Sequence, residues 1–452
     1  MKTKHAIYPY QAKRYFPALL LISTLVRGAS GQLPPAPAPR QVQQAQQAPQ
    51  TQVGLSWNQL KLLFAAANPS LKADAAGVDE LRAMEITAFL RPNPQLTVGE
   101  DGFNPFGGPN GLRPVTSVQE QTILSYLHER QRKRELRLQS AKEGTQIGQS
   151  LHQDLTRTLL FTLRSAFVQT LQARAILELA KADLEYYDKI IDISKIRLKD
   201  GDIAEIDFQR IELQRVQYEA QLQMAIVNLR TANIQLLQLL NDRTPVDKFE
   251  ISGPFDFADA LAPLDSFHQT ALAERPDLRA AIQTIQQSKT NHRLAIANGS
   301  TDPTFNIWET HNPSFNNTTY NANTIGLSVN IPLRIFDRNQ GEKQRTLIDI
   351  TKSQYTTDAA TAQVFSDVNS AYEQVRSNIE LLKPYKAKYS DEATKVRDTV
   401  GYAYFHGGAS LMDFLNAQSD YRVVQTAYLQ LIGAYLVATG QLNLSVGREV
   451  IP

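Results

Sequence analysis

Two aspartates stand at matching places behind two glycine turns. Asp207 follows Gly201 by six residues, Asp413 follows Gly407 by six residues, and a phenylalanine follows each aspartate. Each turn separates two segments whose apolar spacing is typical of helices. A carboxylate near the start of a helix can accept hydrogen bonds from the free amides there, or it can attract cations. The sequence leaves both roles open.

The other residue types that carry chemistry form no site pattern. The chain has no Cys, which excludes disulfides, thiolate metal sites and Cys nucleophiles. Several histidines are scattered without the spacing of metal ligands: His128, His152, His268, His292, His311 and His406. No nucleophile motif, phosphate-binding loop or catalytic pair of carboxylates occurs. We therefore expect neither an enzyme nor a bound cofactor or metal.

The composition limits the class of protein. The chain has 452 residues, enough for two or three ordinary domains or one elongated one. Lys and Arg number 47 against 45 for Asp and Glu, so the net charge of +2 gives no reason to expect nucleic acid as a partner. Inside the chain no apolar run reaches about 18 residues, so we expect no membrane-spanning helix.

The N-terminal region is predicted to be an export signal followed by a linker. Residues 1–31 combine a basic lead, the apolar run "YFPALLLISTLV" and the small residues "GASG", which is typical of a signal peptide. The alternative, an amphipathic anchor, requires apolar residues at helical spacing, whereas here they are grouped in a block. Residues 32–53 are rich in Pro, Gln and Ala and are expected to form an extended linker.

Beyond the linker the sequence repeats itself. "ANPSLKA" at 67–73 returns as "ERPDLRA" at 274–280, and "PNPQLTV" at 92–98 returns as "TDPTFNI" at 301–307. The two glycine turns are a third matching pair in the same order, which indicates duplication. The sequence therefore predicts two repeats, residues 54–241 and 274–452, joined by a connecting segment at 242–273.

Each repeat has the same predicted layout. In the first, a helix at 69–92 precedes two strand-like pieces at 95–100 and 116–124, and then a long helix at 132–199, the turn, and a helix that ends at Asn241. The long helix would span roughly 100 Å and the two shorter helices together roughly 93 Å. Two short helices stacked end to end would therefore match one long helix, which predicts a rod of antiparallel helices.

The segment "NTIGLSVNIPL" has the pattern of a transmembrane β-strand. Its apolar residues alternate with small or polar ones: Ile325, Leu327, Val329, Ile331 and Leu333. Four strands cannot close a barrel, and an open edge in lipid leaves backbone groups unpaired. The chain is therefore expected to oligomerise, to eight or twelve strands, and a conduit favours twelve because eight leave a lumen filled with side chains.

The whole mature sequence resembles the outer membrane efflux protein family, the TolC-like proteins. The resemblance rests on the duplicated "NPSL" and "RPDL" helices, the strand pairs, and the turns at Gly201 and Gly407. The stretch "PLRIFDRNQGE" is similar to the junction between strand and helix in the heavy-metal, CzcC-like branch. The residues of this junction motif are Pro332, Phe336, Asp337, Arg338, Asn339, Gln340 and Gly341.

The resemblance implies a fold, a location and partners. The fold is mostly α with a small β part: a homotrimer with a twelve-stranded barrel in outer membrane lipid and a coiled-coil tunnel in the periplasm. The implied function is a passive exit duct that works with a periplasmic membrane-fusion adaptor and an inner-membrane efflux pump, a resistance-nodulation-division pump for metal cations or drugs. The alternatives are the duct of a type I secretion system, or a non-conducting coiled-coil protein that spans the periplasm.

The resemblance also assigns roles to the two turns, as the periplasmic tips of the tunnel. Adaptor docking would involve Leu198, Lys199, Asp200, Gly201, Asp202, His406, Gly407 and Gly408. In the family, a carboxylate behind the first turn links to a Tyr and an Arg of the neighbouring hairpin and closes the aperture. Asp207 and Tyr404 match two of these groups, but Ala409 stands where the Arg would be.

Asp413 matches the first of two acidic rings that narrow the family's aperture, and Asn416 stands where the second would be. Three Asp413 carboxylates around a pore would raise one another's pKa and concentrate cations. The structural alternatives are that both aspartates cap the following helices, and that Gly201, Gly407 and Gly408 are present because a hairpin needs a left-handed backbone.

Overall fold

The computed structural model describes residues 54–103, 115–312 and 322–451. The predicted signal peptide and the predicted linker lie outside these residues. The chain divides into two units, residues 1–51 and 52–452, and the second contains every described residue.

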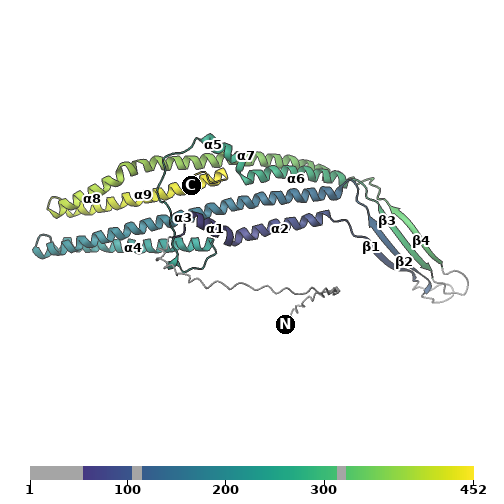
Figure 1. Ribbon diagram of the computed structural model, residues 1–452, viewed down its shortest axis with the longest axis horizontal. Coiled ribbons are helices and arrows are strands. Elements are labelled where there is room, and N and C mark those ends of the chain that lie inside the picture. Colours follow the sequence, from purple (N-terminus) through teal and green to yellow (C-terminus); the bar gives the residue numbers. More distant parts are fainter. Residues whose placement is uncertain (1–53, 104–114, 313–321, 452) are drawn as a thin grey trace, which may run out of the picture. The chain divides into compact units, whose positions relative to one another are not determined.

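The same order of elements occurs twice (Figure 1). The first half contains α1 (Trp57–Ala67), α2 (Pro69–Phe89), β1 (Gln95–Phe103), β2 (Val115–Leu127), α3 (Lys133–Asp200) and α4 (Glu205–Leu239). The second half contains α5 (Leu264–Glu274), α6 (Pro276–Asn298), β3 (Thr304–Asn312), β4 (Ala322–Asn330), α7 (Gln340–Pro384), α8 (Ser390–Phe405) and α9 (Leu411–Val446). The predicted fold class, mostly α with a small β part, is confirmed.

Helices α1 and α5 extend the similarity of the two halves beyond the predicted motifs. One residue separates the end of each from a proline that opens the next helix. This residue, Asn68 or Arg275, has the same extended backbone in both halves (φ −61°, ψ 121° and φ −64°, ψ 121°). Proline suits the first position of a helix because the amide there has no partner within the helix. Sequence analysis missed both helices because each is short and stands beside a proline.

The predicted end-to-end stacking of short helices on a long one is present. Helix α3 packs against both α2 and α4, which follow one another along it (Figure 1). The side chain of Asn68 at the start of α2 donates to the carbonyl of Leu239 at the end of α4 (3.0 Å). In the second half, Arg275 before α6 donates to the carbonyl of Ser445 near the end of α9 (3.2 Å). One polar side chain therefore fastens each of the two junctions.

The second long helix is interrupted, contrary to the prediction of one continuous helix. Helix α7 ends at Pro384, a single π-helical turn spans Tyr385–Tyr389, and α8 continues from Ser390. Proline has no amide hydrogen and its ring crowds the preceding turn, so the helix widens locally. The ammonium of Lys386, in this turn, contacts the Asp256 carboxylate at 2.9 Å, which ties the interruption to the segment before α5.

The four strands form one antiparallel sheet in the order β1-β2-β3-β4. Neighbouring strands place Leu96 opposite Leu124, Leu124 opposite Ile307, and Ile307 opposite Leu327, so apolar side chains form a row across one face. Leu327 in this row is 76% exposed. An apolar face with this exposure in the single chain matches the lipid-facing side predicted from the alternation.

The opposite face of the sheet is mixed, with polar side chains beside Ile123 and Trp308. Asn306 donates to the Ser328 hydroxyl across β3 and β4 (3.2 Å). Trp308 lies against Gly326 so closely that a Cβ at position 326 would stand 2.3 Å from the indole ring. Within the described residues, β1 and β4 each have only one neighbouring strand. The sheet therefore has two open edges, which further strands must cover in a membrane.

Three apolar clusters hold the helices together. One joins α5, α7 and α9, a second joins α1, α3 and the end of α4, and a third lies between the four helix ends at the two turns. On α3, Leu163, Phe167 and Leu171, spaced by four residues, are buried. Among the described helices, α9 alone has the length and apolar composition to cross a membrane, and it packs along α7 and α3.

Candidate gate at the helical turns

The first turn is a helix end closed by a left-handed glycine. Gly201 has φ 81°, and its amide donates to the carbonyl of Leu198 (3.1 Å) while the amide of Asp202 donates to that of Arg197 (2.8 Å). This pairing satisfies the last carbonyls of α3, and glycine alone adopts the required backbone without strain. The structural role expected for Gly201 is therefore confirmed.

The second turn uses one of its two glycines in the same way. Gly407 has φ 79°, and the amide of Gly408 donates to the carbonyl of Ala403 (2.7 Å). Gly408 lies outside the left-handed region, and a Cβ there would meet Ala403 at ordinary contact distances, 3.6 Å or more. The prediction that Gly408 is needed for a left-handed backbone is wrong, because the Gly407 residue alone reverses the chain.

Aromatic side chains pack the two turns together. Tyr404 is buried and stacks on Phe414, with ring centres 4.9 Å apart, while Phe208 lies in the same cluster. Deeper in the cluster, Tyr187 of α3 stacks on Tyr218 of α4 at 4.6 Å. The phenylalanines that follow the two aspartates thus form the core between the turns, and they fix the position of each aspartate on the helix that follows.

Asp207 lies in the first turn of α4 but does not cap it. The N-cap residue is Ala204, and no side chain caps this helix. The Asp207 carboxylate is 3.7 Å from the Arg210 guanidinium. Burial raises the pKa of Tyr404, the Arg197 guanidinium lowers it in part, and the charge of Asp207 raises it further. Asp207 therefore acts electrostatically on the tyrosine with which the family resemblance pairs it.

Arg197 is a functional candidate that sequence analysis missed. Its guanidinium lies 5.2 Å from the centre of the Tyr404 ring and donates to the Tyr404 carbonyl at 3.5 Å. The arginine expected from the resemblance is replaced by Ala409, which packs against the aromatic cluster. The sequence signal for Arg197 is a basic residue in the last turn of α3, where it also complements the helix dipole.

Asp413 belongs to a capping box. Its carboxylate accepts hydrogen bonds from the hydroxyl and the amide of Ser410 (2.7 and 3.2 Å), and its amide donates to the Ser410 hydroxyl (3.2 Å). These bonds lower the pKa of Asp413. The sequence "SLMD" carries the signature of this motif. The capping alternative therefore fits Asp413 and not Asp207, while a place in the aperture remains a prediction for both.

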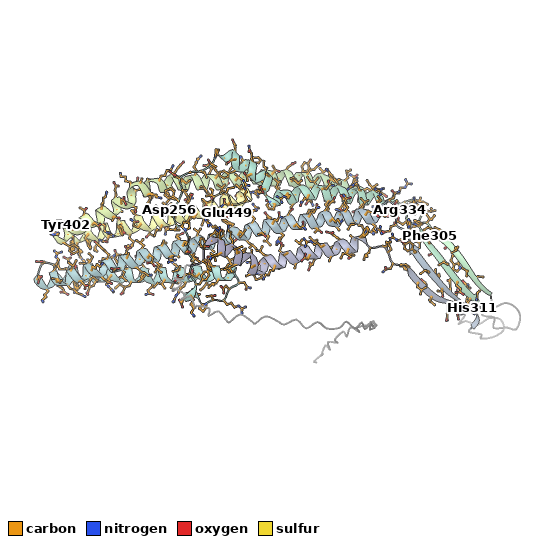
Figure 2. All side chains as sticks on the ribbon, in the orientation of Figure 1. Asp256, Phe305, His311, Arg334, Tyr402 and Glu449 are labelled. Carbon is orange, nitrogen blue, oxygen red and sulfur yellow. The ribbon has the colours of Figure 1, made fainter. Side chains whose placement is uncertain are left out.

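The predicted docking residues lie on the surface of the turns, except that Leu198 packs partly against the aromatic cluster. His406 stacks on Tyr402 at 3.9 Å, and its Nδ1 lies 2.8 Å from the Tyr402 carbonyl (Tyr402 is labelled in Figure 2). Among the described residues no group of three or more His, Asp or Glu side chains could hold a metal ion. His406 is held on Tyr402 by a ring contact and by its Nδ1.

The junction motif builds the turn between β4 and α7. Asn339 has φ 60°, a backbone that Asn adopts more easily than most residues. Its amide donates to the Asp337 carboxylate (2.8 Å). Its side chain donates to the carbonyl of Ala295 in α6 (2.8 Å), and Gln340 donates to the carbonyl of Phe336 (3.1 Å). Phe336 itself is 90% exposed. The polar residues of the motif therefore have a structural role.

Comparison with known proteins agrees with this geometry. The sequence profile described as Outer membrane efflux protein matches residues 268–448, which covers the second half from α5 to the end of α9. The outer membrane protein TolC of Salmonella enteritidis is 23% identical over 397 residues, 84% of this chain and 78% of TolC. The second half of the chain therefore matches the outer membrane efflux protein family, and the similarity to TolC extends over most of the chain.

Further relatives extend the similarity over most of the chain. The cobalt-zinc-cadmium resistance protein CzcC of Cupriavidus metallidurans is 23% identical over 399 residues, 85% of this chain and 88% of CzcC. The structure of CusC superposes with a TM-score of 0.73 at 17% identity, covering 87% of this chain and 92% of CusC. The CmeC channel of Campylobacter jejuni gives 0.70 at 13% identity, covering 88% and 87%. These two structures share the fold.

TolC is an outer membrane protein, CusC forms a transmembrane channel and CmeC is an outer membrane channel. The apolar row across the sheet is the part suited to lipid; Phe305 on this face and His311 near the end of β3 are labelled in Figure 2. The predicted docking, gate and junction residues remain proposals.

Proposed function

We propose that this efflux protein is the exit duct of a tripartite system, in which an inner-membrane pump and a periplasmic adaptor deliver substrate to it. The observation that carries the proposal is the sheet, which has one apolar face, one face with polar side chains and, within the described residues, two open edges. A periplasmic scaffold without contact to lipid does not fit such a sheet. Its exposed leucines and isoleucines would form an apolar patch in water, which soluble proteins rarely leave uncovered.

The proposed assembly is a homotrimer. Each open edge leaves backbone groups unpaired, which in lipid costs several kcal/mol per group, so copies of the chain must join edge to edge. Two copies would give eight strands and a lumen filled by side chains, whereas three give twelve and a wider passage. The polar face with Asn306 and Ser328 would then line this passage.

The proposed adaptor site comprises the two turns. Their surface residues are exposed, while the aromatic cluster beneath them is packed around Tyr404 and Phe414. A partner can therefore bind the turns without disturbing the core. If one hairpin then shifts against the other, the contacts of Arg197 and Asp207 near Tyr404 must change. We infer that adaptor binding opens the passage by this shift.

The proposed pump is a resistance-nodulation-division exporter of metal cations. The similarity to CzcC, whose name records cobalt, zinc and cadmium resistance, supports this choice, and so does the junction motif at Pro332 to Gly341. Drug export is the alternative within the same pump class. A type I secretion duct is the alternative outside this pump class.

Single-channel recording in planar bilayers tests the duct itself. Purified trimers are expected to give a small, cation-preferring conductance that increases in the Asp207→Ala variant. Folded, membrane-inserted trimers that conduct no current, even after the turns are deleted, would favour the non-conducting coiled-coil protein instead.

Growth of a deletion strain tests the cargo. Loss of the chain is expected to sensitise cells to zinc, cobalt or cadmium and to raise their metal content, with recovery by the wild-type gene. Sensitivity to drugs alone would assign a drug pump, and retention of a secreted protein in the periplasm or cytoplasm would assign type I secretion.

A further inference from the structure

A cavity of about 430 Å³ lies between α1, α3, the start of α6 and the end of α9, away from both turns and from the sheet. One part of its wall is apolar and includes Trp57, Leu160, Phe161 and Pro276. The other part is charged and includes Lys61, Arg157, Arg164, Arg279, Arg448, Glu274 and Glu449. Cations outnumber acids on this wall, so the cavity favours a negatively charged guest.

The acids of the cavity are already engaged. Glu449, labelled in Figure 2, accepts hydrogen bonds from the Lys61 ammonium (2.7 Å) and from the Trp57 indole (2.8 Å). Burial raises the pKa of Glu449, but these two donors lower it below its ordinary value. Glu274 faces the Arg448 guanidinium at 3.7 Å. Both carboxylates therefore already face cations of the protein.

The remaining arginines of the wall differ in their partners. Arg157 contacts the Asp154 carboxylate at 2.5 Å and donates to the Leu444 carbonyl. Arg279 donates to the Gln153 side chain at 3.1 Å and to the Glu274 carbonyl at 3.5 Å. Each of these guanidinium groups has an acceptor within the protein.

Arg164 has none. Its guanidinium lies 4.9 Å from the centre of the Trp57 ring and 5.9 Å from that of Phe167, and in the described part of the chain no acceptor lies within hydrogen-bond or ion-pair distance of it. The side chain is half-buried, and burial lowers its pKa, an effect that Glu449 offsets only in part. A guanidinium that is partly removed from water without an acceptor costs free energy, which a bound anion would recover.

We propose that this cavity is a binding site for an organic carboxylate with a flat apolar body. The carboxylate would pair with the fork of Arg164, since a guanidinium matches the two oxygens of a carboxylate. The apolar body would lie against Trp57 and Phe161, as ligands do in pockets lined mostly by apolar side chains with few polar groups. The site is separate from the proposed gate, because none of its residues belongs to the turns.

Fluorine NMR of a small probe tests this site on the full-length trimer in lipid nanodiscs. The probe is 4-(trifluoromethyl)benzoate, and the neutral comparison is 4-(trifluoromethyl)benzyl alcohol. The benzoate signal is expected to broaden saturably with wild-type protein, and the affinity is expected to fall about tenfold in Arg164→Met, the effect of losing one charge-assisted hydrogen bond. Arg376→Met is the matched control, because Arg376 is an exposed arginine of α7 paired with Glu373.

The outcomes separate the proposal from its rivals. Equal binding of the alcohol and the benzoate, unchanged in Arg164→Met, would show an apolar pocket and overturn the proposal. If inorganic phosphate competes with an affinity equal to that of the benzoate, the site recognises charge alone, and the proposal is overturned. Absence of benzoate binding to the wild-type protein would also overturn the proposal. If Arg164→Met does not form trimers, Arg164→Lys carries the test, because it keeps the charge and loses the fork, and weaker benzoate binding is expected.

Discussion

The Arg197 guanidinium lies 5.2 Å from the centre of the Tyr404 ring and donates to the Tyr404 carbonyl, so α3 and α8 are joined by a charged contact beside the two turns. In the proposed gate, this contact would replace the one that the family resemblance gives to an arginine at the position of Ala409. The carboxylate of Asp207 acts on the same tyrosine. The proposed gate is therefore built from one cation, one tyrosine and one acid, with the cation supplied from a different helix.

Removing this cation is expected to loosen the gate. The Arg197→Met variant keeps the apolar stem but loses the ring contact, worth about 1 kcal/mol, which is about fivefold in the ratio of closed to open channels. Single-channel recording of purified trimers measures the open probability. Lys199→Met is the matched control, because Lys199 is exposed in the same turn. An equal open probability in wild type and Arg197→Met would exclude Arg197 from the gate.

The two glycines of the second turn are expected to respond differently to alanine. Gly407→Ala places a side chain in the left-handed region, which costs roughly 1–2 kcal/mol, and should lower the thermal midpoint of the trimer. Gly408→Ala should leave the midpoint nearly unchanged, because its backbone is ordinary and its Cβ would have room. Circular dichroism on heating measures both. A larger loss of stability in Gly408→Ala would contradict the assignment of the turn to Gly407.

The regular parts of this fold could be predicted from the sequence. The strand pattern around Ile325 and Leu327 and the helix lengths follow from periodicity, which reports which side of an element meets an apolar environment. The motif repeat also gave the order of elements in both halves. The break at Tyr385 was not predicted, since a proline indicates a disturbance of the helix but not whether the helix ends, bends or widens.

The candidate site could be predicted only in part. Asp207 and Asp413 look equivalent in the sequence, yet Ser410 draws Asp413 into a capping box while Ala204 gives Asp207 no such partner. Arg197 was missed because its contact with Tyr404 spans more than two hundred residues of sequence, a pairing that local patterns cannot show. Separations of this kind become visible only when the helices are packed.

The charge and the cap of Asp413 can be separated by mutation. Asp413→Asn is expected to remove the cation preference of the channel. Ser410→Ala removes the hydroxyl partner but keeps the charge, so the channel should retain its cation preference. The thermal midpoint of Ser410→Ala should fall, because loss of a cap costs about 1 kcal/mol. Reversal potentials in a salt gradient measure the preference. Retained preference in Asp413→Asn would leave Asp413 with the capping role only.

The same aspartate gives a pH dependence with a defined direction. Hydrogen bonds from Ser410 lower the pKa of Asp413, so its charge persists as the pH falls to its ordinary pKa of 3.8, and is lost only below it. Repulsion among three carboxylates in a trimer would act in the opposite direction. A cation preference that disappears on acidification only below 3.8 would show that the bonds dominate, and loss well above 3.8 would show that the carboxylates face one another across the pore.

A buried acid in the seam between α3 and α9 is expected to make the trimer less stable at neutral pH. Asp183 is 9% exposed and lines a cavity of about 460 Å³ together with Arg422, and within the described residues it has no hydrogen bond and no ion pair. Burial raises its pKa to about 6, which Arg422 and Arg397 counteract only in part. Their guanidinium groups lie instead over the rings of Tyr218 (5.1 Å) and Tyr421 (4.1 Å).

Since the pKa of Asp183 is higher in the folded chain than its ordinary 3.8, folding favours the protonated acid, and stability falls as the pH rises from about 4 to about 6. Asp183→Asn, which resembles the protonated acid, should therefore raise the thermal midpoint at about pH 7.5 and change it little at about pH 4. Asp188→Asn is the matched control on the same helix, because Asp188 is half-exposed and contacts Arg215 at 2.5 Å. The control should gain no stability at either pH. An unchanged midpoint in Asp183→Asn at neutral pH would mean that water or counter-charge in the cavity keeps Asp183 ionised without cost. The charge of Asp183 would then not lower the stability of the seam.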